Sequence, residues 1–191
     1  MTSAAPPLRA DAQRNRAAII SAAAAAFAAE GTNVNLEQVA GMAGVGVGTI
    51  YRRFATVEAL LAVVLETKMT DYALRAEQAA ADALTRPWEA FRDFAMYVLE
   101  QQADDVALAE LSIPSARCDA LFPAQSHRIV TASILLVDRA KAAGALRPDL
   151  EYRDLWLLKD ASAALGRTTP DGWRRLAGYL LEAFRMSPPT D

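Results

Sequence analysis

Residues 44–54 decide the fold of this 191-residue chain, and they read Gly44-Val45-Gly46-Val47-Gly48-Thr49-Ile50-Tyr51-Arg52-Arg53-Phe54. A short segment of small and apolar residues ends at Gly44, and a second one begins after Val45. Two short helices that meet at a tight turn containing glycine form a helix-turn-helix unit, whose second helix can enter the major groove of DNA. The stretch therefore predicts a DNA-binding head.

The residues on either side extend this pattern. Asn35-Leu36-Glu37-Gln38-Val39-Ala40 precede the stretch, and Glu58-Ala59-Leu60-Leu61 follow it. Over roughly residues 14–64, about a quarter of the chain, the sequence closely resembles the DNA-binding domain of TetR-family transcriptional regulators. The resemblance implies a head of three small helices followed by a larger helical body.

The composition favours an all-α fold, because 53% of the residues are hydrophobic while Gly and Pro are sparse. We expect about nine helices. A continuous helix should join the N-terminal three-helix bundle to a C-terminal helical domain. The expected domains are residues 9–56, which bind DNA, and residues 57–186, which bind a ligand and dimerise. Residues 1–8 and 187–191 read as flexible ends, and residues 115–123 read as a loop.

Local signals mark where several helices begin and end. Asp11 is a plausible N-cap for the first helix, and Gly31 should end that helix. Asn35 and Gln38 have the spacing of a capping box. Thr56 should cap the fourth helix.

The charge distribution fits a small head that faces DNA on an acidic body. The whole chain has a net charge of −3, but residues 1–55 contain five arginines against three carboxylates. The remainder carries 15 basic and 20 acidic side chains. Phosphate contacts need local positive charge, so the negative total does not exclude DNA.

The single cysteine, Cys118, excludes an intrachain disulfide and favours a reducing compartment. No stretch approaches the ~20 strongly apolar residues that a membrane span requires. We therefore expect a cytoplasmic protein without a membrane partner.

The resemblance assigns the DNA contacts to the second helix of the motif and its surroundings. Gly46–Thr49 form the leading end, which lies against base edges, and Tyr51 and Arg53 fall where the family contacts phosphates. Arg52 could reach either a base or the backbone. A solvated surface without function is the alternative for the last three residues. The DNA-binding candidates are Arg14, Arg16, Asn35, Gly46, Val47, Gly48, Thr49, Tyr51, Arg52 and Arg53.

Four positions depart from the family pattern. Many relatives have Pro at position 55 and a basic residue at 57, where this chain has Ala55 and Val57. Positions 41 and 42, commonly basic or polar, are Gly41 and Met42. The missing cation at 57 removes a phosphate contact, so we expect weaker or more shape-dependent DNA binding than in a typical relative.

Aromatic and mixed stripes in the body suggest a largely apolar ligand pocket, since such pockets carry a few polar groups and often lie between helices. Core packing is the alternative for each aromatic side chain. His127 could instead be a satisfied buried group or an exposed residue at a loop end. The ligand-binding candidates are Met69, Tyr72, Trp88, Phe91, Tyr97, His127, Thr131 and Ile134.

The last helix carries an apolar stripe wider than packing within one chain needs, and such a stripe usually marks an interface. The resemblance implies a four-helix contact between two copies, made by the last two helices of each. These helices could otherwise simply close the body. The dimer candidates are Trp156, Trp173, Leu176, Ala177, Leu180, Leu181 and Phe184.

The sequence thus predicts a ligand-responsive transcriptional regulator, usually a repressor, that binds a palindromic operator as a homodimer. The alternative is a helical ligand-binding or scaffold protein whose DNA-binding head is weak or inactive. An enzyme is disfavoured, because no metal-ligand spacing, nucleophile elbow or glycine-rich phosphate loop is present. We assign no catalytic residue, metal or cofactor. The partners expected are double-stranded DNA, a small-molecule effector and a second copy of the chain.

Overall fold

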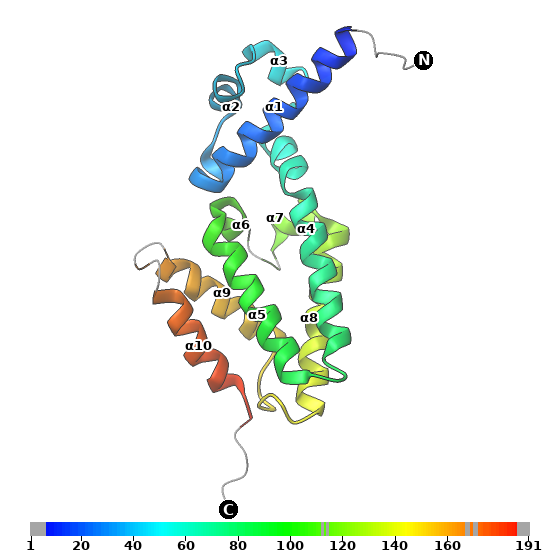
Figure 1. Ribbon diagram of the computed structural model, residues 1–191, viewed down its shortest axis with the longest axis vertical. Helices are drawn as coiled ribbons and strands as arrows, with labels where there is room; N and C mark the ends of the chain where they lie inside the picture. The colour runs from blue at the N-terminus through cyan, green and yellow to red at the C-terminus, as the bar shows by residue number, and fades with distance from the viewer. Residues whose placement is uncertain (1–6, 112, 114, 167–168, 170–171, 187–191) are drawn as a thin grey trace, which may run out of the picture. The chain divides into compact units, whose positions relative to one another are not determined.

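The computed structural model describes residues 7–111, 113, 115–166, 169 and 172–186. Every regular element in these ranges is a helix, which confirms the predicted all-α fold (Figure 1). None of the helices described is long and apolar enough to cross a membrane. The elements are α1 (Pro7–Glu30), the 3-10 helix η1 (Gly31–Asn33), α2 (Leu36–Ala43), α3 (Val47–Tyr51), α4 (Val57–Asp82), α5 (Pro87–Asp104), α6 (Val106–Glu110), α7 (Ala116–Leu121), α8 (Pro123–Ala142), α9 (Tyr152–Gly166) and α10 (Gly172–Phe184).

The prediction of where the first helix begins was wrong. α1 begins at Pro7, so Asp11 lies inside the helix and pairs with Arg14 instead of capping it. Proline suits a first helical turn because the N–H it lacks would have no partner there.

The segment expected to be a loop after residue 115 contains α7. The Ser115 hydroxyl caps this helix by accepting a hydrogen bond from the backbone N–H of Cys118 at 3.1 Å. The described residues therefore form ten α-helices instead of about nine. The ends expected to be flexible fall largely outside the described residues, although Pro7 and Leu8 belong to α1.

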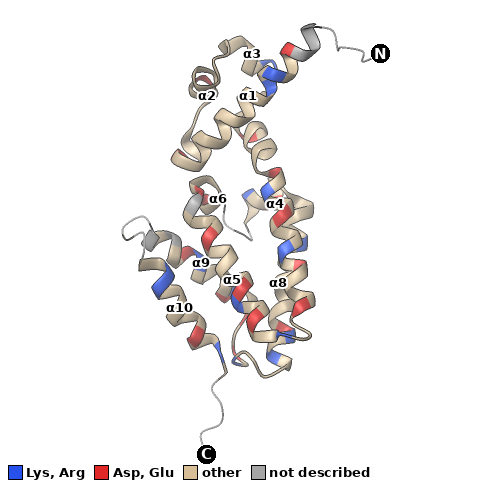
Figure 2. Cartoon of the chain, in the orientation of Figure 1, with Lys and Arg blue, Asp and Glu red and all other residues tan. Residues whose placement is uncertain are grey.

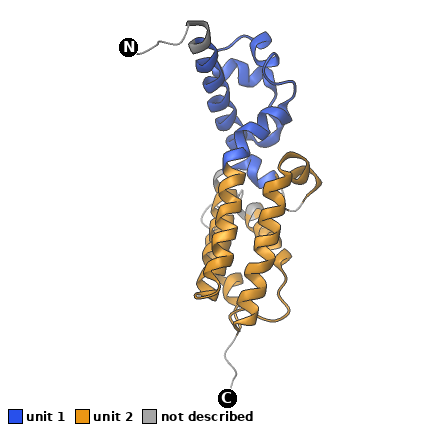
Figure 3. Ribbon diagram, turned by 90° about the vertical axis from the view of Figure 1, so that its right-hand side faces the viewer, with its two compact units in different colours: residues 1–67, 105–110 blue, residues 68–104, 111–191 orange. Residues whose placement is uncertain are grey.

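The helices form two compact units (Figure 3). Unit 1 comprises residues 1–67 and 105–110, and unit 2 comprises residues 68–104 and 111–191. The units part inside α4, whereas the sequence suggested a division after residue 56. The first turns of α4 belong to unit 1, where Leu60, Leu61 and Leu65 are fully buried.

The core of unit 1 comes from residues at helical spacing on short helices. Ile19 and Phe27 of α1, Val39 of α2 and Ile50 of α3 are all at most 1% exposed. α1 packs on α2, and α2 packs on α3. Phe54 is buried as well, whereas Val45, which we expected in the core, is half-buried.

The predicted caps of unit 1 are confirmed. The Asn35 side chain accepts a hydrogen bond from the Gln38 N–H at 2.9 Å, and the Gln38 side chain accepts one from the Asn35 N–H at 2.9 Å. The Thr56 hydroxyl accepts a hydrogen bond from the Ala59 N–H at 3.1 Å. These contacts satisfy backbone donors that the first turns of α2 and α4 leave without a partner.

A carboxylate holds α6 to the end of α1 within unit 1. α1 stops at Glu30, before Gly31, which has a φ of +73°. The next residue, Thr32, donates hydrogen bonds from its N–H and its hydroxyl to one oxygen of Glu110, each at 2.8 Å. A Cβ at Gly31 would lie 2.5 Å from the other oxygen of Glu110. Glycine is therefore required here by both the backbone conformation and the close approach of α6.

Unit 2 is a layered set of helices in which α5 packs against α8 and α9, and α9 packs against α10. Tyr72 of α4 is the centre of an aromatic cluster, with ring centroids 5.4 Å from Tyr97 and 6.5 Å from Trp156. The turn after α8 pairs with the end of α10, where the Arg147 N–H donates to the Phe184 carbonyl at 3.0 Å.

The capping box gives a test of head stability. We expect Asn35→Ala to lower the free energy of unfolding by about 1 kcal/mol, because the N–H of Gln38 loses its partner. Urea denaturation followed by circular dichroism measures this change. Asn33→Ala, an exposed substitution outside the capping box, is the matched control. Equal losses for the two variants would contradict the assignment.

Candidate functional site

The turn between α2 and α3 gives unit 1 a helix-turn-helix. Gly44 has a φ of +65°, and its N–H donates to the carbonyls of Ala40 and Gly41. Gly46 is the N-cap of α3, and its carbonyl accepts a hydrogen bond from the Thr49 N–H at 2.8 Å. The reversal between the two helices thus takes three residues, Gly44 to Gly46.

α3 has one buried and one open side. Ile50 is fully buried, whereas Val47 and Tyr51 are each 47% exposed. A Cβ built at Gly48 would have no atom within 4 Å, so the backbone there is accessible. Thr49 is half-buried between the two sides. The predicted leading end is therefore open to a partner, as a helix that enters a groove requires.

The arginines predicted to contact phosphates lie around this helix. Arg53 donates to the carbonyl of Ala12 in α1 at 2.9 Å, which brings it to the first half of α1. Arg14 and Arg16 are exposed on that half of α1, where Figure 2 shows basic residues near the start of the helix. Arg52 donates to the hydroxyl of Thr49 at 3.2 Å.

The hydroxyl of Tyr51 is engaged in a hydrogen bond with a carboxylate. Tyr51 donates a hydrogen bond to Glu37 of α2 at 2.5 Å. This hydrogen bond lowers the pKa of Glu37 and raises the pKa of Tyr51, so the pair consists of a carboxylate and a neutral phenol near pH 7. A negative charge thus lies beside a residue predicted to contact phosphate.

The remaining candidates of the head are constrained in different ways. The side-chain oxygen of Asn35 is engaged in the capping box, which leaves its amide N–H₂ group for other partners. Val57 is the first residue of α4 and follows the Thr56 cap. Gly41 and Met42 are exposed, so the two departures from the family pattern on α2 lie at the surface.

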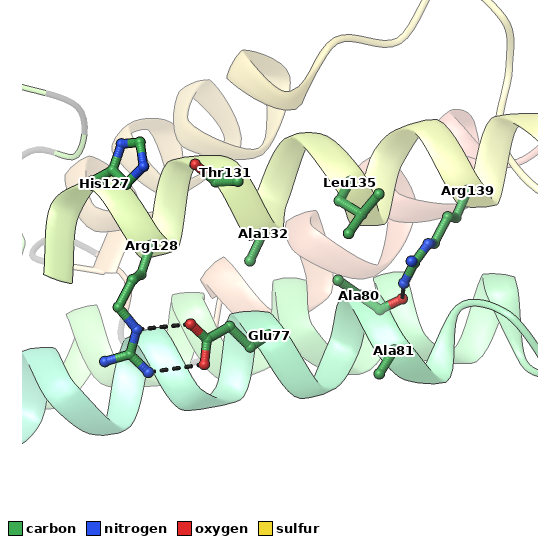
Figure 4. Close-up of a pocket in the computed structure, with 9 residues that line it drawn as sticks. All are labelled: Glu77, Ala80, Ala81, His127, Arg128, Thr131, Ala132, Leu135 and Arg139. Atoms are coloured by element: carbon green, nitrogen blue, oxygen red, sulfur yellow. Dashed lines mark hydrogen bonds and ion pairs between the residues drawn. The ribbon is translucent and has the colours of Figure 1, made fainter. Parts of the chain in front are cut away.

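Unit 2 contains a groove of about 360 Å³ between α4 and α8 (Figure 4). The predicted ligand residues His127 and Thr131 line it. At one end Arg128 and Glu77 form a bidentate ion pair at 2.7 and 2.8 Å. At the other end Arg139 donates to the carbonyl of Ala80 at 2.6 Å. Both arginines therefore already have partners, and the apolar residues that line the groove are three alanines and Leu135.

The other predicted ligand residues lie elsewhere in unit 2. Met69 and Tyr72 are fully buried, and half-buried Tyr97 packs on Tyr72. Trp88 and Phe91 form a separate aromatic contact, with ring centroids 6.4 Å apart. Ile134 is 39% exposed and does not line the groove. The structure thus divides the eight candidates among a groove, a buried aromatic layer, a second aromatic contact and the surface. They share no single cavity.

Much of the predicted dimer stripe is used within the chain. Four of its members are buried in the protomer, namely Trp156, Trp173, Ala177 and Leu181. Leu176, Leu180 and Phe184 are half-buried. The exposed apolar side chains on α9 and α10 are Leu157 and Tyr179, each 64% exposed, and nothing lies within 4 Å of a Cβ built at Gly178. A second copy could contact Leu157, Tyr179 and Gly178 more readily than the residues predicted for the dimer.

Sequence reasoning missed three charged residues. Glu37 and Glu110 belong to short helices and pair with residues that only folding brings near. Lys159 is 1% exposed on α9. Its spacing of three from Trp156 could have indicated an inward position. Within the described ranges, no group of three or more potential metal ligands is present.

The helix-turn-helix region of the chain matches a known protein family. Residues 19–64 match the family model described as "Bacterial regulatory proteins, tetR family". No curated protein matches the sequence.

Three solved structures illustrate the similarity over the whole chain. The TetR transcription regulatory protein from Mycobacterium vanbaalenii is 28% identical, with a TM-score of 0.54 over 94% of this chain and 99% of that one. A TetR transcriptional regulator from Streptomyces coelicolor is 25% identical, with a TM-score of 0.58 over 91% and 99% of the two chains. The regulator FadR from Bacillus subtilis, in complex with stearoyl-CoA, shares the fold at 19% identity, with a TM-score of 0.65 over 87% and 96%. The helix-turn-helix domain thus matches the TetR family over residues 19–64, and the whole chain is similar in fold to solved TetR transcriptional regulators.

Proposed function

We propose that the chain is a ligand-responsive transcriptional repressor that binds a palindromic operator as a homodimer. The observation that carries the proposal is the open side of α3. Val47, Gly48 and Tyr51 are exposed there, while Ile50 holds the helix to the core. A family of DNA-binding regulators uses this unit, and the match covers residues 19–64.

DNA recognition would divide between the start of α3 and the surrounding arginines. The accessible backbone at Gly48 and the side chain of Thr49 would face base edges, where a threonine can donate or accept a hydrogen bond or contact a thymine methyl group. Arg53 and the arginines of α1 would contact phosphates, which fix the register of the protein on the duplex.

A homodimer would present two such helices to two half-sites about one helical turn apart, which is why a palindromic operator is expected. The exposed Leu157 and Tyr179 and the half-buried Leu176, Leu180 and Phe184 would provide the apolar part of the contact. Because both copies use the same surface in a two-fold dimer, each of these residues would contribute to the contact from both copies.

A ligand in unit 2 could act on unit 1 through the chain itself. The chain passes between the two units at residues 67–68, 104–105 and 110–111, and α6 between the last two is held to Thr32 by Glu110. An effector that prefers one conformation of unit 2 would shift the population of heads able to bind DNA. That shift requires different affinities for the two conformations, so tight binding alone is not sufficient.

The decisive experiment is a mobility-shift assay with the DNA upstream of the chain's own gene, followed by footprinting. A protected site with two-fold symmetry and two half-sites is the expected result. Absence of a specific shift at low salt, with correctly folded protein, would overturn the proposal.

A second candidate function is a ligand-binding or scaffold protein with a weak DNA-binding head. Two observations favour it. The Glu37 carboxylate lies 2.5 Å from the Tyr51 hydroxyl, and Val57 stands where many relatives have a cation. A mobility shift that stays non-specific at every salt concentration would support this candidate over the first.

Removal of one proposed phosphate contact should change the salt dependence of binding. We expect Arg53→Gln to weaken binding to all sequences alike and to reduce the slope of log K against log salt by about 0.9. Titrations between low and moderate salt measure the slope. Arg92→Gln removes a charge from unit 2 and should leave the slope unchanged. A loss confined to one base position would instead assign Arg53 to base readout.

Restoring the missing cation should have the opposite effect. We expect Val57→Lys to steepen the slope by about 0.9, because a lysine at the first turn of α4 could neutralise one more phosphate. The same titrations measure it, with Val57→Gln as the uncharged control. If the slope of the lysine variant does not increase, position 57 does not approach the DNA.

A further inference from the structure

One face of α9 carries polar groups into the interior of unit 2. Trp156, Lys159 and Ser162 follow each other at intervals of three, so they share a helix face. Their exposed fractions are 4%, 1% and 4%. All three polar groups are buried, and within the part of the chain that the structure describes the indole N–H, the ammonium and the hydroxyl have no hydrogen-bond partner.

Two other helices contribute to the same layer. The ring of Tyr72 from α4 stacks on Trp156, with centroids 6.5 Å apart and planes 25° apart. Among the described residues, the Tyr72 hydroxyl and the side-chain oxygen of Gln102 on α5 also lack a hydrogen bond of regular geometry, although the two side chains interact. Burial raises the pKa of Tyr72, and Gln102 lowers it by a smaller amount, so the phenol remains a hydrogen-bond donor.

The charge of Lys159 is poorly compensated. Its Nζ lies 2.8 Å from a carboxylate oxygen of Asp160, but the two groups form no hydrogen bond and the Asp160 side chain is 55% exposed. Among the described residues of unit 2, no carboxylate is buried with it. A buried ammonium whose ion-pair partner is an exposed carboxylate is costly, and so are polar atoms without hydrogen bonds on the same helix face, so native cores rarely keep them without an occupant.

The donors in this layer determine what an occupant must offer. The ammonium, the indole and the phenol are all donors, and among the described residues of this layer the ammonium is the charged group that is buried. The rings of Tyr97 and Trp156 both pack on the ring of Tyr72. A complementary molecule therefore has an anionic acceptor on an apolar, preferably aromatic, body.

We propose that Lys159, Trp156 and Tyr72 form the anion-binding end of the effector site, and that the effector is an amphipathic organic acid. This proposal rests on the proposed function as a ligand-responsive regulator. The acid group would accept hydrogen bonds from Lys159 Nζ and Trp156 Nε1, and the apolar body would pack on the rings. The groove between α4 and α8 is a poorer anion site, because Arg128 and Arg139 already have partners there.

A matched pair of fluorescent probes tests the proposal on the full chain. 1-Anilinonaphthalene-8-sulfonate is an aromatic anion, and N-phenyl-1-naphthylamine has the same ring system without the sulfonate. We expect Lys159→Met to weaken binding of the sulfonate by about 10- to 100-fold and to leave binding of the neutral probe unchanged. Arg153→Met removes a charge from the exposed side of α9 and should change neither affinity.

Thermal unfolding without any probe gives a second measurement. Lys159→Met should raise the melting temperature by about 3 °C, because methionine fills a similar volume without an uncompensated charge. A lower melting temperature would assign Lys159 a structural role and overturn the proposal. Equal loss of both probes, or unchanged binding of the sulfonate, would overturn it as well.

The mobility-shift assay separates this proposal from the proposed function. A Lys159→Met chain that shifts DNA as the unmodified chain does, but has lost the sulfonate, supports both. A chain that shifts DNA and keeps the sulfonate overturns only the anion site. A chain that binds the sulfonate through Lys159 but never shifts DNA overturns only the regulator.

Discussion

At Gly44 the backbone turns with a φ of +65°, and its N–H closes the end of α2 on two carbonyls. A residue with a Cβ is strained in this conformation, so the reversal depends on glycine. α3 begins three residues later, and the turn therefore sets which of its side chains meet the core. Ile50 enters the core, while Val47 and Tyr51 stay outside. The candidate DNA surface depends on this one local constraint.

The strength of the DNA contact depends on a balance of charges around that surface. Arg53 is held at the start of α1 by the Ala12 carbonyl, in the part of the head where Arg14 and Arg16 are exposed. Glu37 opposes them through its hydrogen bond to Tyr51. Phosphate affinity is governed by the number of neutralised charges, so our proposal is that the neutral residue at 57 and the carboxylate at 37 weaken the contact with DNA.

The interior of unit 2 differs from a core in which every buried polar atom has a hydrogen-bond partner. Local rules are usually broken at functional sites, where stability is lower than the fold could provide. The buried layer around Lys159 breaks the rule that interior polar atoms have partners, and it does so at five atoms from three helices. A binding site that is incomplete without its ligand has this character, whereas the aromatic contact of Trp88 and Phe91 has the character of ordinary packing.

The sequence was sufficient for the helical fold, the helix-turn-helix and the caps at Asn35 and Thr56, because these depend on residues within one or two turns of each other. The residues that bind a ligand were harder to predict from the sequence. The aromatic stripes were visible, but a stripe does not reveal whether it faces a groove, a core or solvent. His127 lines the groove, Tyr72 lies in the core and Ile134 lies at the surface.

The sequence by itself therefore determined that the chain is helical, where α2 and α4 begin and which short motif forms the helix-turn-helix, since local hydrogen bonds and periodicity encode them. Only the tertiary structure decided which distant residues meet. Glu110 reaches Thr32 across 78 positions, and Lys159 becomes a buried charge on the helix whose Trp156 stacks on Tyr72. The reason is that burial and pairing are properties of packed helices, and packing depends on all the faces that come together.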